Sequence, residues 1–222
     1  SLSTYVLVSL GTSKRAMTAA FRYLILGTVG ATFYVIGVGL MYQMTGTLNI
    51  ADLAERLPAV AETRTILIAL AFLTIGIGLK AGLFPLHIWL PNAYCFAPSV
   101  VTSFLAATAT KVAVYVLLRV YFTVFGIETI EMLAVEELLL AIGLIAIVLM
   151  STVAIYQNDA KRLLAYSSVA QIGYMVIGIS MFTVNGLTAT LIHLFNHALM
   201  KAALFLALAS IYYRIKSVNI QD

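Results

Sequence analysis

Six long apolar stretches alternate with short polar segments along the chain. The apolar stretches cover about residues 22–43, 65–90, 99–121, 134–156, 163–184 and 187–212. Each has the ~20 residues that an α-helix needs to cross a bilayer, and within lipid an unpaired single segment satisfies its backbone hydrogen bonds only as a helix. The pattern therefore predicts an all-α, polytopic membrane protein with six complete spans.

Two shorter segments complete the pattern. Residues 1–12 are apolar but supply only about half of the length of a spanning helix. This indicates that the chain starts inside a helix, so we expect it to be an internal piece of a longer protein. The segment NIADLAERL predicts a short helix at the membrane interface, in which Asp52, Glu55 and Arg56 face water.

The composition agrees with a lipid environment. Hydrophobic residues make up 62% of the sequence and charged residues 10%, whereas a soluble domain is nearer half apolar and a quarter charged. The net charge of +4 is small and fits basic loops at a membrane better than a nucleic-acid-binding surface. The single cysteine, Cys95, excludes an intrachain disulfide and a cysteine-based metal cluster.

Basic residues are distributed unevenly between the two sides that alternating spans define. One side carries Lys14, Arg15, Arg22, Lys161, Arg162, Arg214 and Lys216, and the other carries Arg56, Arg64 and Arg119. Cytoplasmic loops of membrane proteins carry an excess of lysine and arginine. We therefore expect loops 13–21, 157–162 and 213–222 to lie in the cytoplasm.

Three lysines lie inside the apolar stretches. Lys80, Lys111 and Lys201 are each far enough into a predicted helix to lie ~20 Å along it, near the bilayer midplane. A charge at that depth costs ~3 kcal/mol on insertion scales. Three lysines at matched depth favour a functional role. The alternative is that each ammonium only tethers its helix to a backbone carbonyl.

Two histidines precede the last of these lysines on the same predicted helix. His193, His197 and Lys201 are spaced i, i+4, i+8 and fall along one helix face. Buried histidines and lysines can exchange protons near neutral pH, so the row favours a proton relay. Satisfied core histidines remain an alternative. A metal site is disfavoured because no cysteine, aspartate or glutamate is close in sequence to supply further ligands.

The helix that carries Lys80 has a sequence that predicts a break. Gly82 follows the lysine closely, and Pro85 cannot donate a hydrogen bond to the preceding turn. Broken helices at the membrane midplane line cavities in transporters. The alternative is an ordinary proline kink. His87 lies just past the break and is a candidate for an access path.

The acidic residues supply no partner for the buried lysines. All nine lie in predicted loops or near helix ends, namely Asp52, Glu55, Glu62, Glu128, Glu131, Glu136, Glu137, Asp159 and Asp222. Either the lysines are neutral, or their counter-charges belong to parts of the protein outside this sequence.

Four stretches resemble the antiporter-like membrane subunits of Mrp-type sodium/proton antiporters, respiratory complex I and membrane-bound hydrogenases. They are KAGLFPLHIWLPNAY, APSVVTSFLAATATKVAVYVLLR, NDAKRLLAYSSVAQIGYMVIG and HLFNHALMKAALFL. The resemblance implies two inverted five-helix repeats with a discontinuous helix, of which this chain holds parts, and pairs 22–43 with 187–212.

The resemblance also implies roles for the buried residues. Lys80 matches the lysine on the broken helix of the first half-channel, and Lys111 matches the lysine of the central path. His193, His197 and Lys201 match the residues that link the two half-channels. The glutamate that pairs with the first lysine in the family, and the second broken helix, have no counterpart in this sequence.

From the residues and the resemblance together we expect an ion-translocating subunit of a larger complex in a bacterial inner membrane. It would move H⁺, in exchange for Na⁺, and its partners would be other membrane subunits and the lipid bilayer. The alternatives are a proton-pumping subunit of complex I or a hydrogenase, and a purely structural subunit. The sequence has no redox motif, nucleotide-binding loop or catalytic triad, so we expect no cofactor.

Overall fold

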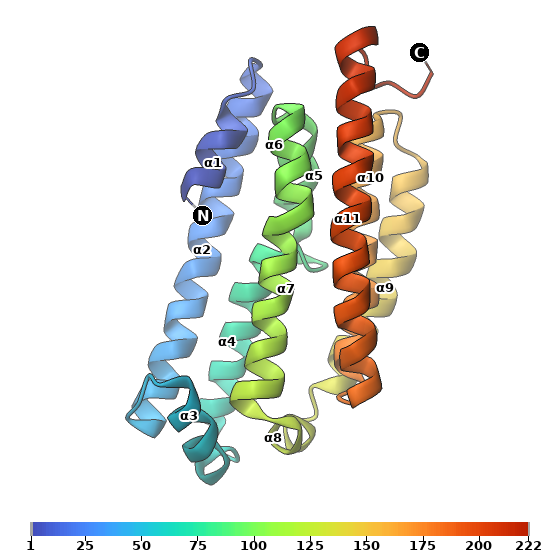
Figure 1. Ribbon diagram of the computed structural model, residues 1–222. Coiled ribbons are helices and arrows are strands. Elements are labelled where there is room, and N and C mark those ends of the chain that lie inside the picture. The colour runs from blue at the N-terminus through green and yellow to red at the C-terminus, as the bar shows by residue number, and fades with distance from the viewer. Residues whose placement is uncertain (1, 222) are drawn as a thin grey trace.

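Each predicted span is helical in the computed structural model, which describes residues 2–221 (Figure 1). The six helical segments that are long and apolar enough to cross a membrane, among the described residues, are Lys14–Thr45, Arg64–Phe96, Ser99–Phe125, Glu136–Ile155, Ala160–Ser180 and Val184–Ile215. The elements in chain order are α1 (Leu2–Ser9), α2 (Lys14–Thr45), α3 (Ile50–Arg56), η1 (Leu57–Val60), α4 (Arg64–Ala81), η2 (Leu86–Ile88), α5 (Trp89–Phe96), α6 (Ser99–Phe104), η3 (Leu105–Ala109), α7 (Thr110–Leu118), η4 (Arg119–Phe125), α8 (Ile127–Met132), α9 (Glu136–Ile155), α10 (Ala160–Ser180) and α11 (Val184–Ile215).

Helix α2 begins earlier than its apolar stretch. The segment 13–21 was expected to be a loop, and that expectation is wrong for residues 14–21, which form the first turns of α2. Ser13 caps this helix because its hydroxyl accepts the N–H of Ala16 at 3.2 Å. An apolar stretch marks only the part of a helix that lies in the bilayer core. The polar first turns of α2 therefore give no helical signal in the hydrophobic pattern.

The other two basic loops are shortened in the same way. α10 starts at Ala160, capped by the Asp159 carboxylate, and α11 continues to Ile215. The segment after α11 lies against the turn before α10, where the N–H of Ala160 donates to the carbonyl of Val218 at 2.9 Å. The start of α2 lies at this same end of the bundle (Figure 1). The basic residues of the three segments expected to be cytoplasmic thus gather at one end.

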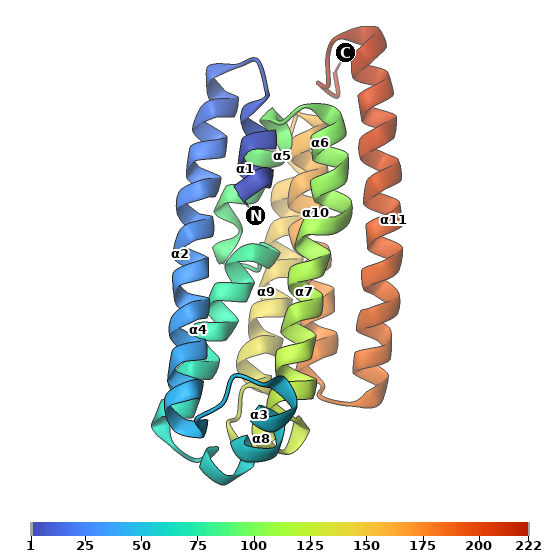
Figure 2. The same cartoon turned by 60° about the vertical axis from the view of Figure 1, so that its left-hand side comes forward.

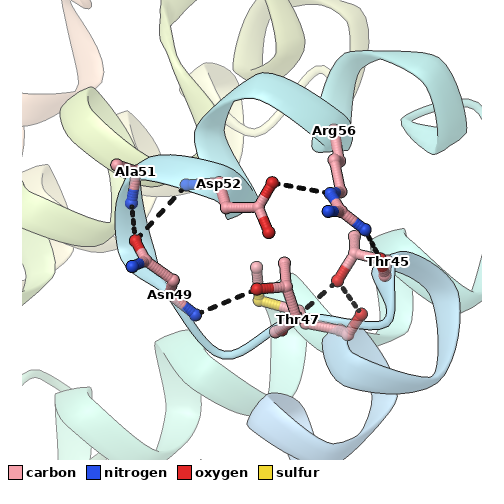
Figure 3. Close-up of polar contacts among 7 residues, drawn as sticks. Thr45, Thr47, Asn49, Ala51, Asp52 and Arg56 are labelled. Atoms are coloured by element: carbon pink, nitrogen blue, oxygen red, sulfur yellow. Dashed lines mark hydrogen bonds and ion pairs between the residues drawn. The ribbon is translucent and has the colours of Figure 1, made fainter.

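The opposite end of the bundle carries the small helices α3 and α8 (Figure 2). Asn49 caps α3 by accepting the N–H of Ala51 at 3.0 Å, and Arg56 pairs with Asp52 at 2.6 Å (Figure 3). Hydrogen bonding to the Thr47 hydroxyl, and then to Arg56, holds the pKa of Asp52 below its ordinary value. The short helix predicted from NIADLAERL is therefore present as α3, while its place at the membrane interface stays a prediction.

Close helix contacts in the bundle use glycine. A Cβ added to Gly76 of α4 would lie 2.7 Å from the carbonyl oxygen of Gly30 on α2, and one added to Gly143 of α9 would lie 3.0 Å from that of Gly173 on α10. Small residues let helix backbones approach closely in membranes, where dispersion contacts drive packing.

The buried apolar side chains form two clusters. One is built mainly from α4, α7, η4 and α10, toward the end that carries α3. The other is built from α1, α2, α5, η3 and α10, toward the basic end. α4 and α5 follow one another along the bundle with a gap between them (Figures 1 and 2). The break in this helix therefore falls near the boundary between the two clusters.

Candidate functional site

Lys111, His197 and Lys201 are buried near the boundary between the two apolar clusters. On the helix formed by α6, η3 and α7, Ala106 belongs to the cluster at the basic end and Ala113 to the other, so Lys111 lies between them. The same boundary crosses α11 between Leu194, which packs against one cluster, and Phe205, which belongs to the other. Lys111, His197 and Lys201 therefore lie at a similar level of the bundle.

The break in the Lys80 helix is built by a glycine. α4 ends at Ala81 because Gly82 adopts the left-handed conformation, with φ of 74°, which glycine reaches without steric cost. The N–H of Leu83 donates to the carbonyl of Gly78 at 2.9 Å, which closes the helix end. The interruption therefore begins three residues before Pro85, which lies in the connection to η2.

A tryptophan holds the broken end in place. The indole N–H of Trp89, at the start of α5, donates to the carbonyl of Leu79 at 2.8 Å. The Trp89 ring stacks on Tyr23 at 4.1 Å between centroids, and Tyr23 meets Tyr5 edge-on at 4.4 Å. These three rings connect the broken helix to α2 and α1. Sequence reasoning missed them, although Trp89 is the one tryptophan of the chain.

Lys80 reaches toward α1 and lines a pocket. Its ammonium donates to the Tyr5 hydroxyl at 2.6 Å. The pocket has a volume of about 460 Å³, and the Lys80 side chain is half-buried. The pocket wall also includes Ala109, Val112 and Ala113, which flank Lys111 in sequence. Lys80 thus faces a cavity that extends to the helix carrying the second lysine.

Lys111 is enclosed in the protein. Its side chain is 4% exposed, and its ammonium donates to the carbonyl of Ala106 and to the Thr110 hydroxyl. The helix is π-helical on both sides of the α7 segment, over η3 and η4. π-Helical turns occur frequently at functional sites because they misalign the hydrogen-bond ladder. No sequence pattern indicated these turns.

Two of the three polar residues in the row on α11 face the protein interior. His197 is 0% exposed and Lys201 is 1% exposed, whereas His193 is half-buried. The Lys201 ammonium donates to the carbonyl of Leu164 at 2.9 Å and to the Ser167 hydroxyl at 3.1 Å, both on α10. Lys201 is therefore held by α10 rather than by the helix that carries Lys111.

His197 has no hydrogen-bond partner among the described residues on either ring nitrogen, and Nε2 of His193 has none either. The two rings lie 6.0 Å apart between centroids. Lys111 and Lys201 both lie close enough to His197 to interact with it electrostatically. Buried polar groups need hydrogen-bond partners, and in proteins water molecules supply those that side chains do not.

Four of the predicted residues are thus brought together, namely Lys111, His193, His197 and Lys201. Lys80 lies apart from them, across the pocket that it lines. His87 is also apart. It is 8% exposed, its Nδ1 has no partner among the described residues, and its ring lies 6.5 Å from that of Tyr166.

Within residues 2–221, neither a carboxylate nor a metal-binding group accompanies these residues. The ion pair found there joins Arg56 to Asp52, far along the chain from the buried lysines. No group of three or more histidine, cysteine, aspartate or glutamate residues in this range is arranged to hold a metal ion. The acidic residue Asp222 lies outside the described residues.

Comparisons with known proteins relate the whole chain to respiratory and antiporter membrane proteins. The model of the family described as NADH:quinone oxidoreductase/Mrp antiporter, TM, matches residues 1–222. The N subunit of the NADH-quinone oxidoreductase of Desulforudis audaxviator is 45% identical over 208 residues, which cover 92% of this chain and 40% of that protein. The D subunit of the Na(+)/H(+) antiporter of Alkalihalophilus pseudofirmus is 31% identical over 210 residues, with 92% of this chain and 41% of that protein covered.

Solved structures show the same relationship. A chain in the structure of the Mrp complex from Dietzia sp. superposes with a TM-score of 0.88 at 29% sequence identity, covering 97% of this chain and 40% of that chain. The chain described here thus spans about two fifths of the length of the proteins it matches. It has the antiporter-like membrane fold and is an integral membrane protein.

Proposed function

This chain belongs to the NADH:quinone oxidoreductase/Mrp antiporter transmembrane family, and from that premise we propose that it carries protons through a multi-subunit membrane complex in exchange for Na⁺. The path runs through Lys111, His197 and Lys201, with His193 beside it. Lys80, at its separate pocket, receives protons from one side of the membrane. His87 belongs to a further access route.

The observation that carries this proposal is the environment of His197. A histidine with a purely structural role would form a hydrogen bond to a fixed backbone carbonyl or side chain. His197 is fully buried and lies near two lysines. Neither of its ring nitrogens has a hydrogen-bond partner among the described residues. An imidazole whose two nitrogens are bonded to water can accept a proton on one nitrogen and release one from the other.

The lysines by themselves fit both a tether and a proton carrier. Lys111 and Lys201 each donate to a backbone carbonyl, as the tether alternative requires. The carrier role requires in addition that the ammonium releases its proton. Lysine can do so when buried, whereas arginine keeps its proton in proteins. Replacement of Lys111 by arginine therefore separates the two roles.

The first experiment measures proton flux in vesicles that contain the purified complex. Lys111→Ala and Lys111→Arg are both expected to abolish transport while the complex still assembles, whereas Lys111→His keeps part of it. Lys216→Arg is the matched control, because this exposed lysine lies at the end of α11, and it should transport at the unmodified rate. Normal transport by Lys111→Arg would contradict the proton-carrier role.

A second experiment addresses the histidines. Replacing His193 and His197 together by glutamine keeps hydrogen-bonding capacity but removes titration. We expect transport to fall across the working pH range with assembly intact. If the double variant transports normally, the histidines are structural and the relay is wrong.

The coupled ion separates this proposal from its main alternative. The 45% identity to a component of NADH-quinone oxidoreductase favours a proton pump that a redox reaction elsewhere in the complex drives. In that case proton flux follows quinone reduction and is indifferent to a Na⁺ gradient. We expect instead that an imposed Na⁺ gradient drives proton movement in vesicles without any electron donor. A chain with a purely structural role would leave flux unchanged in every variant above.

The same comparisons support the proposed setting. The partners are other membrane subunits of the complex, and the membrane is a bacterial inner membrane. The end that carries Lys14, Arg162 and Arg214 faces the cytoplasm, because basic residues are retained on that side. Accessibility of cysteines introduced at Lys216 and, at the opposite end, at Glu55 to a membrane-impermeant thiol reagent tests this orientation.

A further inference from the structure

A basic pocket lies at the end of the bundle where α2 begins. It is formed by the first turns of α2, the last turns of α5 and the start of α10, and its volume is about 360 Å³. Its lining residues are Lys14, Arg15, Thr18, Ala19, Arg22, Asn92, Phe96 and Arg162. Four of them are basic and none is acidic, and the proton path proposed above uses none of them.

The charges in this pocket are not neutralised within the described chain. None of its four basic side chains forms an ion pair within residues 2–221. Arg162 is oriented by Asn92, whose Oδ1 accepts from the guanidinium at 3.3 Å, and by the ring of Phe96 at 5.7 Å. The carboxylate of Asp159 caps α10 by accepting the backbone N–H of Arg162 at 2.9 Å, and it is not part of the pocket lining.

The length of α2 places the pocket at the level of lipid headgroups. The helix has 32 residues, so it is about 48 Å long at 1.5 Å per residue, whereas the hydrocarbon core of a bilayer is ~30 Å thick. Residues 23–45 carry no charged side chain and account for about 35 Å. The nine residues from Lys14 to Arg22 therefore project beyond the hydrocarbon into the headgroup layer.

An apolar column descends from the pocket along α2. Met17, Phe21 and Ile25 are all exposed and follow one another at four-residue intervals on one helix face. Each of the first two is adjacent in sequence to a pocket residue, Thr18 and Arg22 respectively. The surface thus offers positive charge at headgroup level, next to an exposed apolar row that starts in the same layer at Met17 and Phe21 and enters the hydrocarbon at Ile25.

We infer that this pocket binds the phosphodiester headgroup of an anionic phospholipid, whose acyl chain lies along the exposed column of α2. Arginine binds phosphate oxygens through two parallel N–H donors. Basic pockets between membrane helices on the cytoplasmic side recognise anionic headgroups in this way. This site is independent of the proposed transport function, because none of the buried lysines or histidines contributes to it.

The test compares two double variants of the complete purified complex in detergent. Arg15→Gln with Arg22→Gln removes two charges from the pocket, and both side chains are exposed. Arg214→Gln with Lys216→Gln removes two charges from the same end of the bundle outside the pocket. Binding of phosphatidylglycerol, phosphatidylcholine and inorganic phosphate is measured by native mass spectrometry.

We expect the pocket variant to bind its most tightly held phosphatidylglycerol about 25-fold more weakly, from the ~1 kcal/mol that each basic residue contributes at an anionic membrane surface. The control variant should stay within about twofold, and phosphatidylcholine binding should not change. Excess inorganic phosphate should not displace the lipid, because it lacks the acyl chain that the α2 column holds.

Three outcomes would overturn the inference. An equal loss of phosphatidylglycerol binding in both double variants would mean that the basic residues act only through the overall electrostatic potential at this end of the bundle. Displacement of the lipid by inorganic phosphate at similar concentrations would mean that the pocket selects free phosphate rather than a lipid. Protection of a cysteine introduced at Arg22 by a neighbouring protein of the assembled complex would mean that a protein segment occupies the pocket.

Discussion

Replacing Gly76 by alanine is expected to force α2 and α4 apart. The added Cβ would lie 2.7 Å from the carbonyl oxygen of Gly30 and 2.7 Å from the backbone nitrogen of Tyr34, both on α2. These are backbone atoms, so no side-chain rotation relieves the contact. Ordinary van der Waals contact starts at 3.4 Å, so the two helices must separate locally by about 0.7 Å.

The expected cost follows from two opposing effects. Inserting a methyl group into a well-packed contact costs ~1–3 kcal/mol, and the upper end applies here because the obstacles are backbone atoms. Alanine favours the helix over glycine by about 1 kcal/mol, which offsets part of that cost. We therefore expect Gly76→Ala to lower the free energy of unfolding by about 2 kcal/mol.

Gly39→Ala supplies the matched control. Gly39 lies inside α2, and a Cβ added there meets nothing within 4 Å. The helix preference then acts alone, and the variant should be stabilised by up to ~1 kcal/mol. The two variants should differ by ~3 kcal/mol, with the lower apparent Tm for Gly76→Ala.

The assay is thermal unfolding of the purified complex in detergent, followed by loss of the native oligomer. Gly76 also lines the Lys80 pocket, so transport in vesicles should fall for Gly76→Ala and stay normal for Gly39→Ala. Equal apparent Tm values for the two variants would refute the close-packing explanation, because both variants would then have gained only helix preference.

Three further outcomes are expected. Trp89→Phe keeps an aromatic ring but loses the N–H donor to Leu79, and should destabilise the complex by about 1 kcal/mol in the same unfolding assay. Tyr5→Phe keeps its packing but removes the acceptor for Lys80, and should slow proton flux about tenfold without loss of assembly, from the ~1.5 kcal/mol of a hydrogen bond to a charged group. Because the folded pKa of Asp52 lies below its ordinary value of 3.8, its contribution to stability is complete above that value and is lost as the pH falls through the folded pKa. A carboxyl carbon NMR titration should therefore give a midpoint below 3.8 in the folded protein, and a midpoint at or above 3.8 would contradict this.

The fold class was accessible from sequence because its cause is local. Water is absent from the bilayer core, so every spanning segment must be both apolar and helical. Each stretch therefore meets this requirement through its own residues. The same local cost makes Lys80, Lys111 and Lys201 conspicuous in their stretches. The break was predicted mainly from Pro85, whereas the structure ends α4 three residues earlier at Gly82, whose lack of a side chain permits the left-handed turn.

Contacts between helices could not be predicted in this way, because they depend on how each helix is rotated and where it crosses its neighbours. The sequence does not indicate that Tyr5 meets Lys80, or that the hydrogen bonds of Lys201 go to α10 rather than to the helix that carries Lys111. It also does not show that four basic residues from α2 and α10 line one pocket.

The sequence by itself thus determined a helical membrane protein with a broken span, three lysines and a histidine pair at depth. The tertiary structure decided which of these groups meet. It placed Lys111, His197 and Lys201 in one electrostatic neighbourhood between two apolar clusters and left Lys80 at a separate pocket. The physical reason is that the cost of a buried charge is a property of one helix, whereas the partners that offset it come from others.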